Sequence, residues 1–208
     1  MNLGLYFSRE LIDSGTIWKL QGHVNGYQFY QGNNLATEVS SGRRFEIIDN
    51  EYLISAEVYD LKRIKVRLLE DDYLCWFEIK DILGRACKCE APKPLIFKRE
   101  HIISCLPAII EWIEDAANEP HEYLWGGTLG PDYDCSGLIQ SAFASQGIWL
   151  PRDAYQQEKF CKNISFDIES LSEKLIPGDL LFFGSTRRCT HVGLHIENGF
   201  YIHSSGLS

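Results

Sequence analysis

The sequence has no uninterrupted apolar run that approaches the roughly 18 residues needed for a membrane-spanning helix. It also lacks an excess of positive charge, since 20 Lys and Arg against 29 Asp and Glu give a formal net charge of -9. Such a chain repels a phosphate backbone and an anionic membrane surface. We therefore expect neither nucleic acid nor a membrane as a partner.

The N-terminus also lacks the layout of a secretory signal peptide. Arg9 and Glu10 interrupt the segment Met1–Asp13 before a long apolar run can form. The seven cysteines are an odd number at irregular spacing, which suits reduced thiols better than a disulfide framework. Together these features predict a soluble cytoplasmic protein.

Core-forming residues, by contrast, are plentiful. The 208 residues are 45% hydrophobic and 12% aromatic, and Pro and Gly are not in excess, which is typical of a folded globular protein. This length suits one large domain or two small ones. A charged, aperiodic stretch over 84–98, with Pro92 and Pro94, predicts a linker and a boundary near residue 95.

The pattern differs on the two sides of this linker. Before it, short apolar or alternating runs separated by Gly and Asn turns predict a small antiparallel barrel or sandwich. After it, helical spacing predicts a helix from Ile102 to about residue 117, and a second helix from Asp134 to near Gly147. The second domain is thus α+β. The predicted strands are 27–30, 44–48, 64–68 and 75–79 in the first part and 180–184, 190–196 and 200–203 in the second.

Three residues of the second part suit nucleophilic catalysis, which needs a thiolate, an imidazole and a group that orients the imidazole. Cys135 begins a predicted helix, where backbone N–H groups and the helix dipole favour the ionised thiol. His191 and His203 lie on two strands joined by a tight turn, so they can stand side by side. We predict that Cys135 is the nucleophile, His191 its base and His203 the residue that fixes the tautomer of His191.

Six short motifs follow one another in order through the second part of the chain. Together they resemble the NlpC/P60 cysteine peptidases, which implies a papain-like α+β catalytic domain over 96–208. The first part, 1–95 with its linker, resembles a small all-β SH3-like barrel. The pairing is similar to the cyanobacterial-type γ-D-glutamyl-L-diamino acid endopeptidases, which hydrolyse the bond between D-Glu and the diamino acid of peptidoglycan stem peptides. The motifs are YLWGG (123–127), DCSG (134–137), LPRD (150–153), PGDLLFF (177–183), THVG (190–193) and YIH (201–203).

The resemblance also implies roles for further residues. Tyr123 matches the tyrosine whose hydroxyl helps the Cys135 amide to hold the oxyanion. In relatives restricted to murein peptides with a free N-terminal L-Ala, acidic and aromatic groups grip that end, so we expect L-Ala-γ-D-Glu-diamino acid peptides as substrates. The positions expected to bind substrate are Asp134, Ser136, Trp125, Arg152 and Asp153.

Two further features concern the same pocket. Tyr73 is expected to help close it, together with the acidic run Glu70, Asp71 and Asp72, although such a run is also typical of a solvated turn. Ala154 replaces a Ser that related sequences often carry, which removes a possible hydrogen bond. Family members usually continue with further sheet after the position of His203, so either the sequence is truncated or those strands are missing.

Three alternatives stay open. A thiol acyltransferase or amidase can share this plan, and a wall-binding module can keep a silent triad. Cys189, His191 and His195 alternate like metal ligands, but two histidines four strand residues apart span about 13 Å, too far for one ion at about 2 Å. We expect no metal and no other cofactor. Packed or exposed thiols are also a better interpretation than a metal site for Cys87, Cys89, Cys105 and His101.

Overall fold

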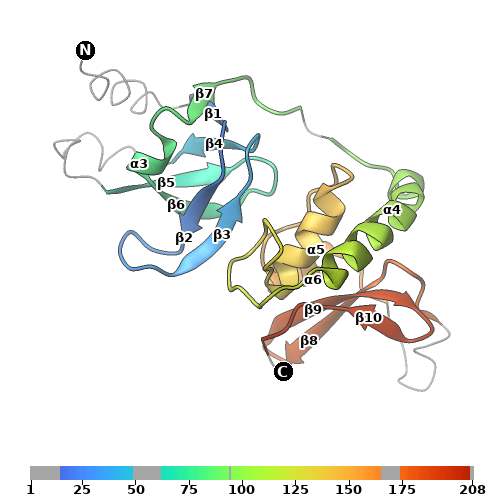
Figure 1. Ribbon diagram of the computed structural model, residues 1–208. Coiled ribbons are helices and arrows are strands. Elements are labelled where there is room, and N and C mark those ends of the chain that lie inside the picture. The colour runs from blue at the N-terminus through green and yellow to red at the C-terminus, as the bar shows by residue number, and fades with distance from the viewer. Residues whose placement is uncertain (1–14, 49–61, 94, 165–173, 207–208) are drawn as a thin grey trace, which may run out of the picture. The chain divides into compact units, whose positions relative to one another are not determined.

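The computed structural model describes residues 15–48, 62–93, 95–164 and 174–206 (Figure 1). The chain divides into two units, Met1–Pro94 and Leu95–Ser208, and each is described by itself. The segment Met1–Asp13, on which the prediction about a signal peptide rests, lies outside the described residues. Within the described ranges, no helix is long and apolar enough to cross a membrane.

The first unit is an antiparallel sheet of seven strands in the order β3-β2-β6-β5-β4-β1-β7. Alternating side chains of these strands form one buried core, in which Phe45 and Phe77 meet edge to face with ring centroids 5.2 Å apart. The SH3-like barrel stays a prediction. The elements are β1 Ile17–Leu20, β2 Val24–Tyr27, β3 Leu35–Val39, β4 Arg44–Ile47, β5 Arg63–Leu68, β6 Leu74–Glu78, α3 Ile79–Ile82 and β7 Ala86–Lys88.

Three of the four strands predicted here are confirmed, as β4, β5 and β6. The strand predicted over 27–30 is wrong, because β2 ends at Tyr27 and the chain then turns. The turn is fixed from a distant part of the sequence. The buried Arg63 donates hydrogen bonds to the carbonyls of Phe29 at 3.0 Å and Gly32 at 2.8 Å, and its guanidinium lies over the Tyr27 ring.

The acidic run Glu70–Asp72 is not simply a solvated turn. The side chains of Glu70 and Asp71 are 9% and 0% exposed, and both accept hydrogen bonds from the buried Arg43, at 3.4 and 2.5 Å. Asp72 alone behaves as expected, with a side chain that is 85% exposed. The turn between β5 and β6 is thus held by a buried ion pair, because an unpaired charge there would be costly.

Within the described residues of the second unit, three helices pack on one face of a three-stranded antiparallel sheet of order β10-β9-β8 (Figure 1). The helices α5 and α6 contact β9, and α4 covers α5. Their shared core includes Ile109 and Ile113 of α4, Ile139 of α5 and Leu194 of β9. The elements are α4 Arg99–Asn118, α5 Cys135–Ala144, α6 Ala154–Phe160, β8 Leu180–Ser185, β9 Arg188–Glu197 and β10 Phe200–Ile202.

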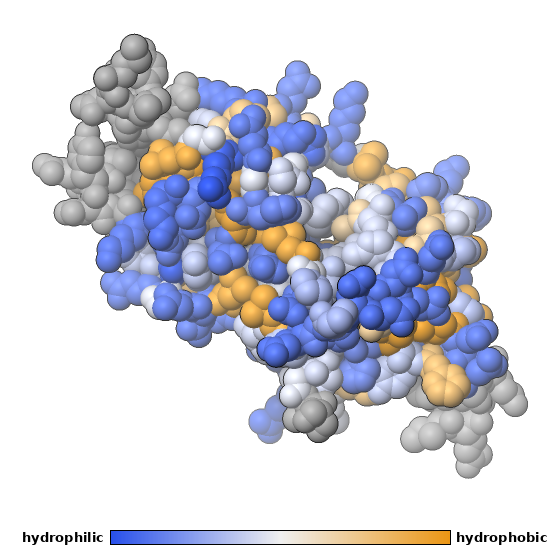
Figure 2. Space-filling view, viewed as in Figure 1, coloured by the Kyte–Doolittle hydropathy of each residue, from blue (hydrophilic) through white to orange (hydrophobic). Residues whose placement is uncertain are grey.

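The mixed α+β nature of this unit is as predicted, including both helices and all three strands. The predictions missed α6, which is short and follows a Pro, an Arg and the N-cap Asp153. The view in Figure 2 is mainly hydrophilic, with hydrophobic residues in separate patches, as expected when charged residues lie mostly at the surface.

Candidate active site

Cys135 is the first residue of α5, and Asp134 is its N-cap. The Asp134 carboxylate accepts a 2.7 Å hydrogen bond from the Gly137 amide, so it satisfies one of the free N–H groups of the first turn. The sequence encodes this start directly, because Asp is a preferred N-cap and small residues follow it. The Cys135 thiol is therefore fixed at a helix N-terminus, as predicted.

A buried ion pair holds this N-cap from the other side. Arg152, which is 1% exposed, donates to both oxygens of Asp134, at 3.0 and 2.6 Å. The same guanidinium contacts the Ser136 hydroxyl at 3.1 Å, and the Gly126 amide donates to Asp134 at 2.8 Å. A bidentate Arg–carboxylate pair of this kind fixes direction as well as distance. The loop before α5 and the loop before α6 are thereby joined around Cys135.

Gly137 explains why the motif needs a glycine after Ser136. A side chain at this position would place its Cβ 2.0 Å from the carbonyl oxygen of Gly127. Only a residue without Cβ allows the loop to lie so close to the first turn of the helix. The YLWGG and DCSG motifs are therefore in contact next to Cys135.

The Cys135 sulfur lies between groups from three segments of the chain. It accepts hydrogen bonds from the backbone amides of Ser136 and Val192. The Tyr123 hydroxyl also hydrogen-bonds to it. Val192 is on β9 directly after His191, so the strand that carries the predicted base reaches the thiol. Tyr123 is placed by a bridge to Tyr133, two residues before Cys135.

His191 and His203 form the second half of the site. His191 lies on β9 and His203 follows β10, and these strands are neighbours in the sheet. Nε2 of His191 and Nδ1 of His203 are 2.7 Å apart, a hydrogen bond in which one nitrogen donates and the other accepts. The predicted side-by-side placement of the two rings is present, and it leaves Nδ1 of His191 available to a second partner.

The protonation of the site follows from burial. Burial and the nearby Asp134 raise the pKa of the Cys135 thiol, and the amides of Val192 and Ser136 and the Arg152 charge only partly oppose this. The Ser136 amide at the helix N-terminus favours the ionised thiol, as expected, but desolvation has the larger effect and the pKa is raised. Burial, followed by repulsion from His203, lowers the pKa of His191. Burial, followed by the charges of Cys135 and Asp134, raises the pKa of Tyr123 to about 12.

At neutral pH these directions give a protonated thiol, an imidazole free to accept a proton, and a phenol that keeps its own. In this state the thiol is neutral at rest, and the neighbouring base removes its proton as the sulfur attacks the substrate. The arrangement is chemically suited to acyl transfer with Tyr123 and the Cys135 amide as donors to an oxyanion.

The other predicted site residues differ in their surroundings. Asp134, Ser136 and Arg152 are buried and bonded to one another, so the structure gives them a role in placing Cys135, and their contact with substrate stays a prediction. Trp125 is 64% exposed and free to meet a ligand.

Asp153 and Tyr73 also stay predictions as substrate-binding residues. Asp153 is half-buried rather than buried, and it caps α6 in a capping box with Gln156. Tyr73 packs partly buried against the core of the first unit.

Two contributors were missed from the sequence. Gln157 is fully buried, and its amide nitrogen donates to the carbonyls of Ser136 at 3.1 Å and Pro151 at 2.9 Å. A polar residue on the apolar face of a helix was the signal that could have revealed it. The Val192 amide is a backbone group, so no side-chain pattern could have pointed to it.

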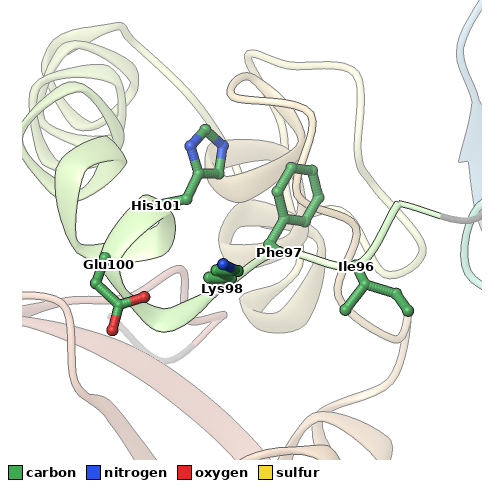
Figure 3. Close-up of a pocket in the computed structure, with 5 residues that line it drawn as sticks. All are labelled: Ile96, Phe97, Lys98, Glu100 and His101. Carbon is green, nitrogen blue, oxygen red and sulfur yellow. The ribbon is translucent and has the colours of Figure 1, made fainter.

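The residues weighed as metal ligands have other contacts. His195 is buried with Nδ1 3.1 Å from the Ile176 carbonyl, and Cys189 donates to the carbonyl of His191. Phe97 and His101 stack with ring centroids 5.0 Å apart. They lie in a pocket at the start of α4, where Glu100 points away from both rings (Figure 3). The lining residues, none of which is a predicted site residue, are Ile96, Phe97, Lys98, Glu100 and His101.

The second unit is thus an α+β domain with a Cys–His site at the meeting of a helix N-terminus and a sheet. Residues 120–208 match the sequence model of the NlpC/P60 family. The matched residues include all six of the motifs that carried the resemblance.

Two curated relatives come from Bacillus subtilis (strain 168). The bifunctional muramidase/DL-endopeptidase CwlT is 42% identical over 96 residues, which cover 43% of this chain and 27% of the relative. The gamma-D-glutamyl-L-lysine dipeptidyl-peptidase is 40% identical over 85 residues, 39% of this chain and 27% of the relative. The chain therefore matches only about a quarter of the length of either relative.

A solved structure is similar over a larger part of the chain. The NlpC/P60 endopeptidase from Photobacterium damselae subsp. piscicida is 15% identical, with a TM-score of 0.53 over 90% of this chain and 59% of that one. At this identity the similarity concerns the fold alone.

Proposed function

We propose that this protein is a cysteine peptidase that hydrolyses the γ-D-glutamyl–diamino acid bond of peptidoglycan stem peptides. The observation that carries the proposal is the 2.7 Å hydrogen bond between Nε2 of His191 and Nδ1 of His203. The residue after His191, Val192, donates its backbone amide to the Cys135 sulfur. The names of the two Bacillus relatives, a DL-endopeptidase and a gamma-D-glutamyl-L-lysine dipeptidyl-peptidase, support this choice of bond.

In the first step, the Cys135 sulfur attacks the carbonyl carbon of the γ-linked amide while His191 takes the thiol proton. The Cys135 amide and the Tyr123 hydroxyl donate to the oxyanion that forms, and the raised pKa of Tyr123 keeps this donor protonated. His191 then gives its proton to the amine of the diamino acid, and the C–N bond breaks. A thioester between Cys135 and the glutamyl fragment remains.

In the second step, water attacks the thioester. His191 takes the proton of the water and returns it to the departing sulfur, so the thiol and the neutral imidazole are restored. His203 holds the ring of His191 in one tautomer throughout, as the carboxylate does in a Ser-His-Asp triad. The products are the glutamyl dipeptide and the free diamino acid.

The preferred substrates in this proposal are small fragments with a free N-terminal L-Ala, and the setting is cell-wall recycling in the cytoplasm. A carboxylate near the pocket binds an ammonium by a charge-assisted hydrogen bond, and it disfavours a polymer that lacks the amine. Asp153 is our candidate for this carboxylate, with the exposed Trp125 beside the amine.

The test is cleavage of L-Ala-γ-D-Glu-meso-diaminopimelate, followed by mass spectrometry. Release of L-Ala-D-Glu supports the proposal, and the Cys135→Ala variant, checked for fold by circular dichroism, supplies the blank. The N-acetylated peptide serves as the matched substrate without an amine. If wild type and variant release the same trace of dipeptide, the proposal fails.

The same reaction separates the two alternatives. Transfer of the glutamyl group to an added amine, in place of hydrolysis, would indicate an acyltransferase. Absence of both reactions, with binding to isolated cell wall, would indicate a binding module whose triad is silent.

A further inference from the structure

Four aromatic rings, one of which is the predicted base His191, form a closed circuit of contacts. Phe183 lies 5.9 Å from His191 between ring centroids, and 5.5 Å from Tyr201. Tyr201 in turn lies 5.2 Å from His203, and His203 is 4.9 Å from His191. Each ring therefore touches two others, and only two of the four belong to the predicted triad.

The sheet itself places these rings together. Phe183 on β8 is the direct register partner of His191 on β9, so both side chains extend from the same face. Tyr201 of β10 lies over Gly193, because a Cβ at Gly193 would be 2.6 Å from the tyrosine ring. The glycine of the THVG motif thus gives Tyr201 the room to reach Phe183.

We propose that Phe183 and Tyr201 are positioning residues that clamp the His191–His203 pair and limit the access of water to it. The hydrogen bond between the two histidines fixes one atom of each ring, but a single bond still allows both rings to rotate about their χ angles. Contacts of two further rings remove that freedom, and edge or tilted aromatic contacts add to the geometry beyond the area they cover. This proposal rests on the proposed function only in the kinetic experiment below, because that experiment requires peptide cleavage.

No charged or titratable side chain belongs to β8, because Leu180–Ser185 contains no ionisable residue. Replacing Phe183 therefore changes the packing of His191 without changing its charged neighbours. Phe183 is 41% exposed and Tyr201 39%, so these rings cover the histidines without sealing them from substrate. The titratable side chain in direct contact with His191 is His203, and Tyr201 lies against His203 in turn. The Val192 amide, next to His191 on β9, hydrogen-bonds to the sulfur of Cys135.

The first experiment needs no activity. The imidazole of His191 is titrated by NMR in a Cys135→Ala background, with its signal assigned by its absence in His191→Gln. Because a less covered imidazole is easier to protonate, Phe183→Leu should raise the midpoint by about half a pH unit. Phe200→Leu, which changes a 73% exposed ring on the same strand as Tyr201, should leave the midpoint where it is.

The second experiment measures kcat/KM for the peptide against pH. Phe183→Leu and Tyr201→Leu should move the acid limb upward by a similar amount and lower the plateau about tenfold through kcat, since a misplaced base is costly. Tyr201→Phe keeps the ring and should restore wild-type values. An unchanged His191 midpoint in Phe183→Leu would overturn the clamp. If wild type cleaves no peptide, the proposed function fails but the NMR titration still decides this question.

Discussion

The helix side of the site, around Asp134, and the sheet side, around His191, are held in different ways. On the helix side a buried carboxylate accepts five hydrogen bonds from Gly126, Ser136, Gly137 and Arg152. On the sheet side one hydrogen bond joins His191 and His203, and rings that remain partly exposed supply the other contacts.

This difference matches what each side has to do. The nucleophile must stay at one place, and a fully paired ionic network in a buried setting is stiff because every alternative arrangement leaves a charge unpaired. The base must accept and release a proton in each step, so it cannot be locked into a charged pair. We therefore expect changes on the helix side to act on stability and changes on the sheet side to act on rate.

The largest expected effect is the loss of the nucleophile or its base. Cys135→Ala and His191→Ala should each lower kcat/KM for the peptide by about 10⁴-fold, because residues that act as a unit fail together. The double variant should be no worse than either single one. Thermal unfolding should stay close to that of the wild type, and additive losses in the double variant would contradict a shared role.

The next effect should fall on stability and on the helix side alone. Arg152→Met removes one partner of a buried ion pair and leaves the Asp134 charge without its counter-ion, at a cost of about 3 to 5 kcal/mol in the free energy of unfolding. Urea unfolding followed by circular dichroism measures it. Arg188→Met is the matched control, because the exposed Arg188 only lies over the ring of Tyr155, and its loss should cost less than about 1 kcal/mol. Equal losses of unfolding free energy in the two variants would contradict the idea that the ion pair of Arg152 and Asp134 stiffens the helix side.

A smaller effect separates rate from stability where the two sides meet. Tyr123→Phe removes the hydroxyl that hydrogen-bonds to the Cys135 sulfur and should lower kcat about 100-fold with little change in KM. The ring keeps its packing, so the unfolding midpoint should not move. An increase in KM with no change in kcat would show that Tyr123 binds substrate instead of an oxyanion.

The sequence indicated the parts of this comparison that depend on local chemistry. Asp134 before Cys135 marks a helix start, and the turn between His191 and His203 marks a hairpin, so both halves of the site could be predicted. The pairing of Arg152 with Asp134 could not, because it joins two loops that no periodicity connects. The turn after Tyr27 failed for a similar reason, since Arg63 from another strand decides it.

The ionisation of Cys135 shows a second limit. A helix N-terminus lowers the pKa of a thiol and burial raises it, and the sequence alone shows only the first influence. Burial prevails in the structure. How deeply a residue is buried depends on contacts such as those of Val192 and Tyr123, which lie far from Cys135 in the sequence.

The smallest predicted effect concerns the pH dependence of the sheet side. Activity requires neutral His191, and the lowered pKa of this residue means that it stays neutral below the ordinary value of 6.5. The acid limb of kcat/KM should therefore have its midpoint below 6.5, measured from pH 4.5 to 8. His203→Gln removes a group whose repulsion helps to lower the pKa of His191, so the midpoint should rise by a fraction of a unit even as the rate falls. A midpoint that falls in His203→Gln would mean that His203 stabilises the protonated form of His191, and the two histidines would then have to be assigned different roles.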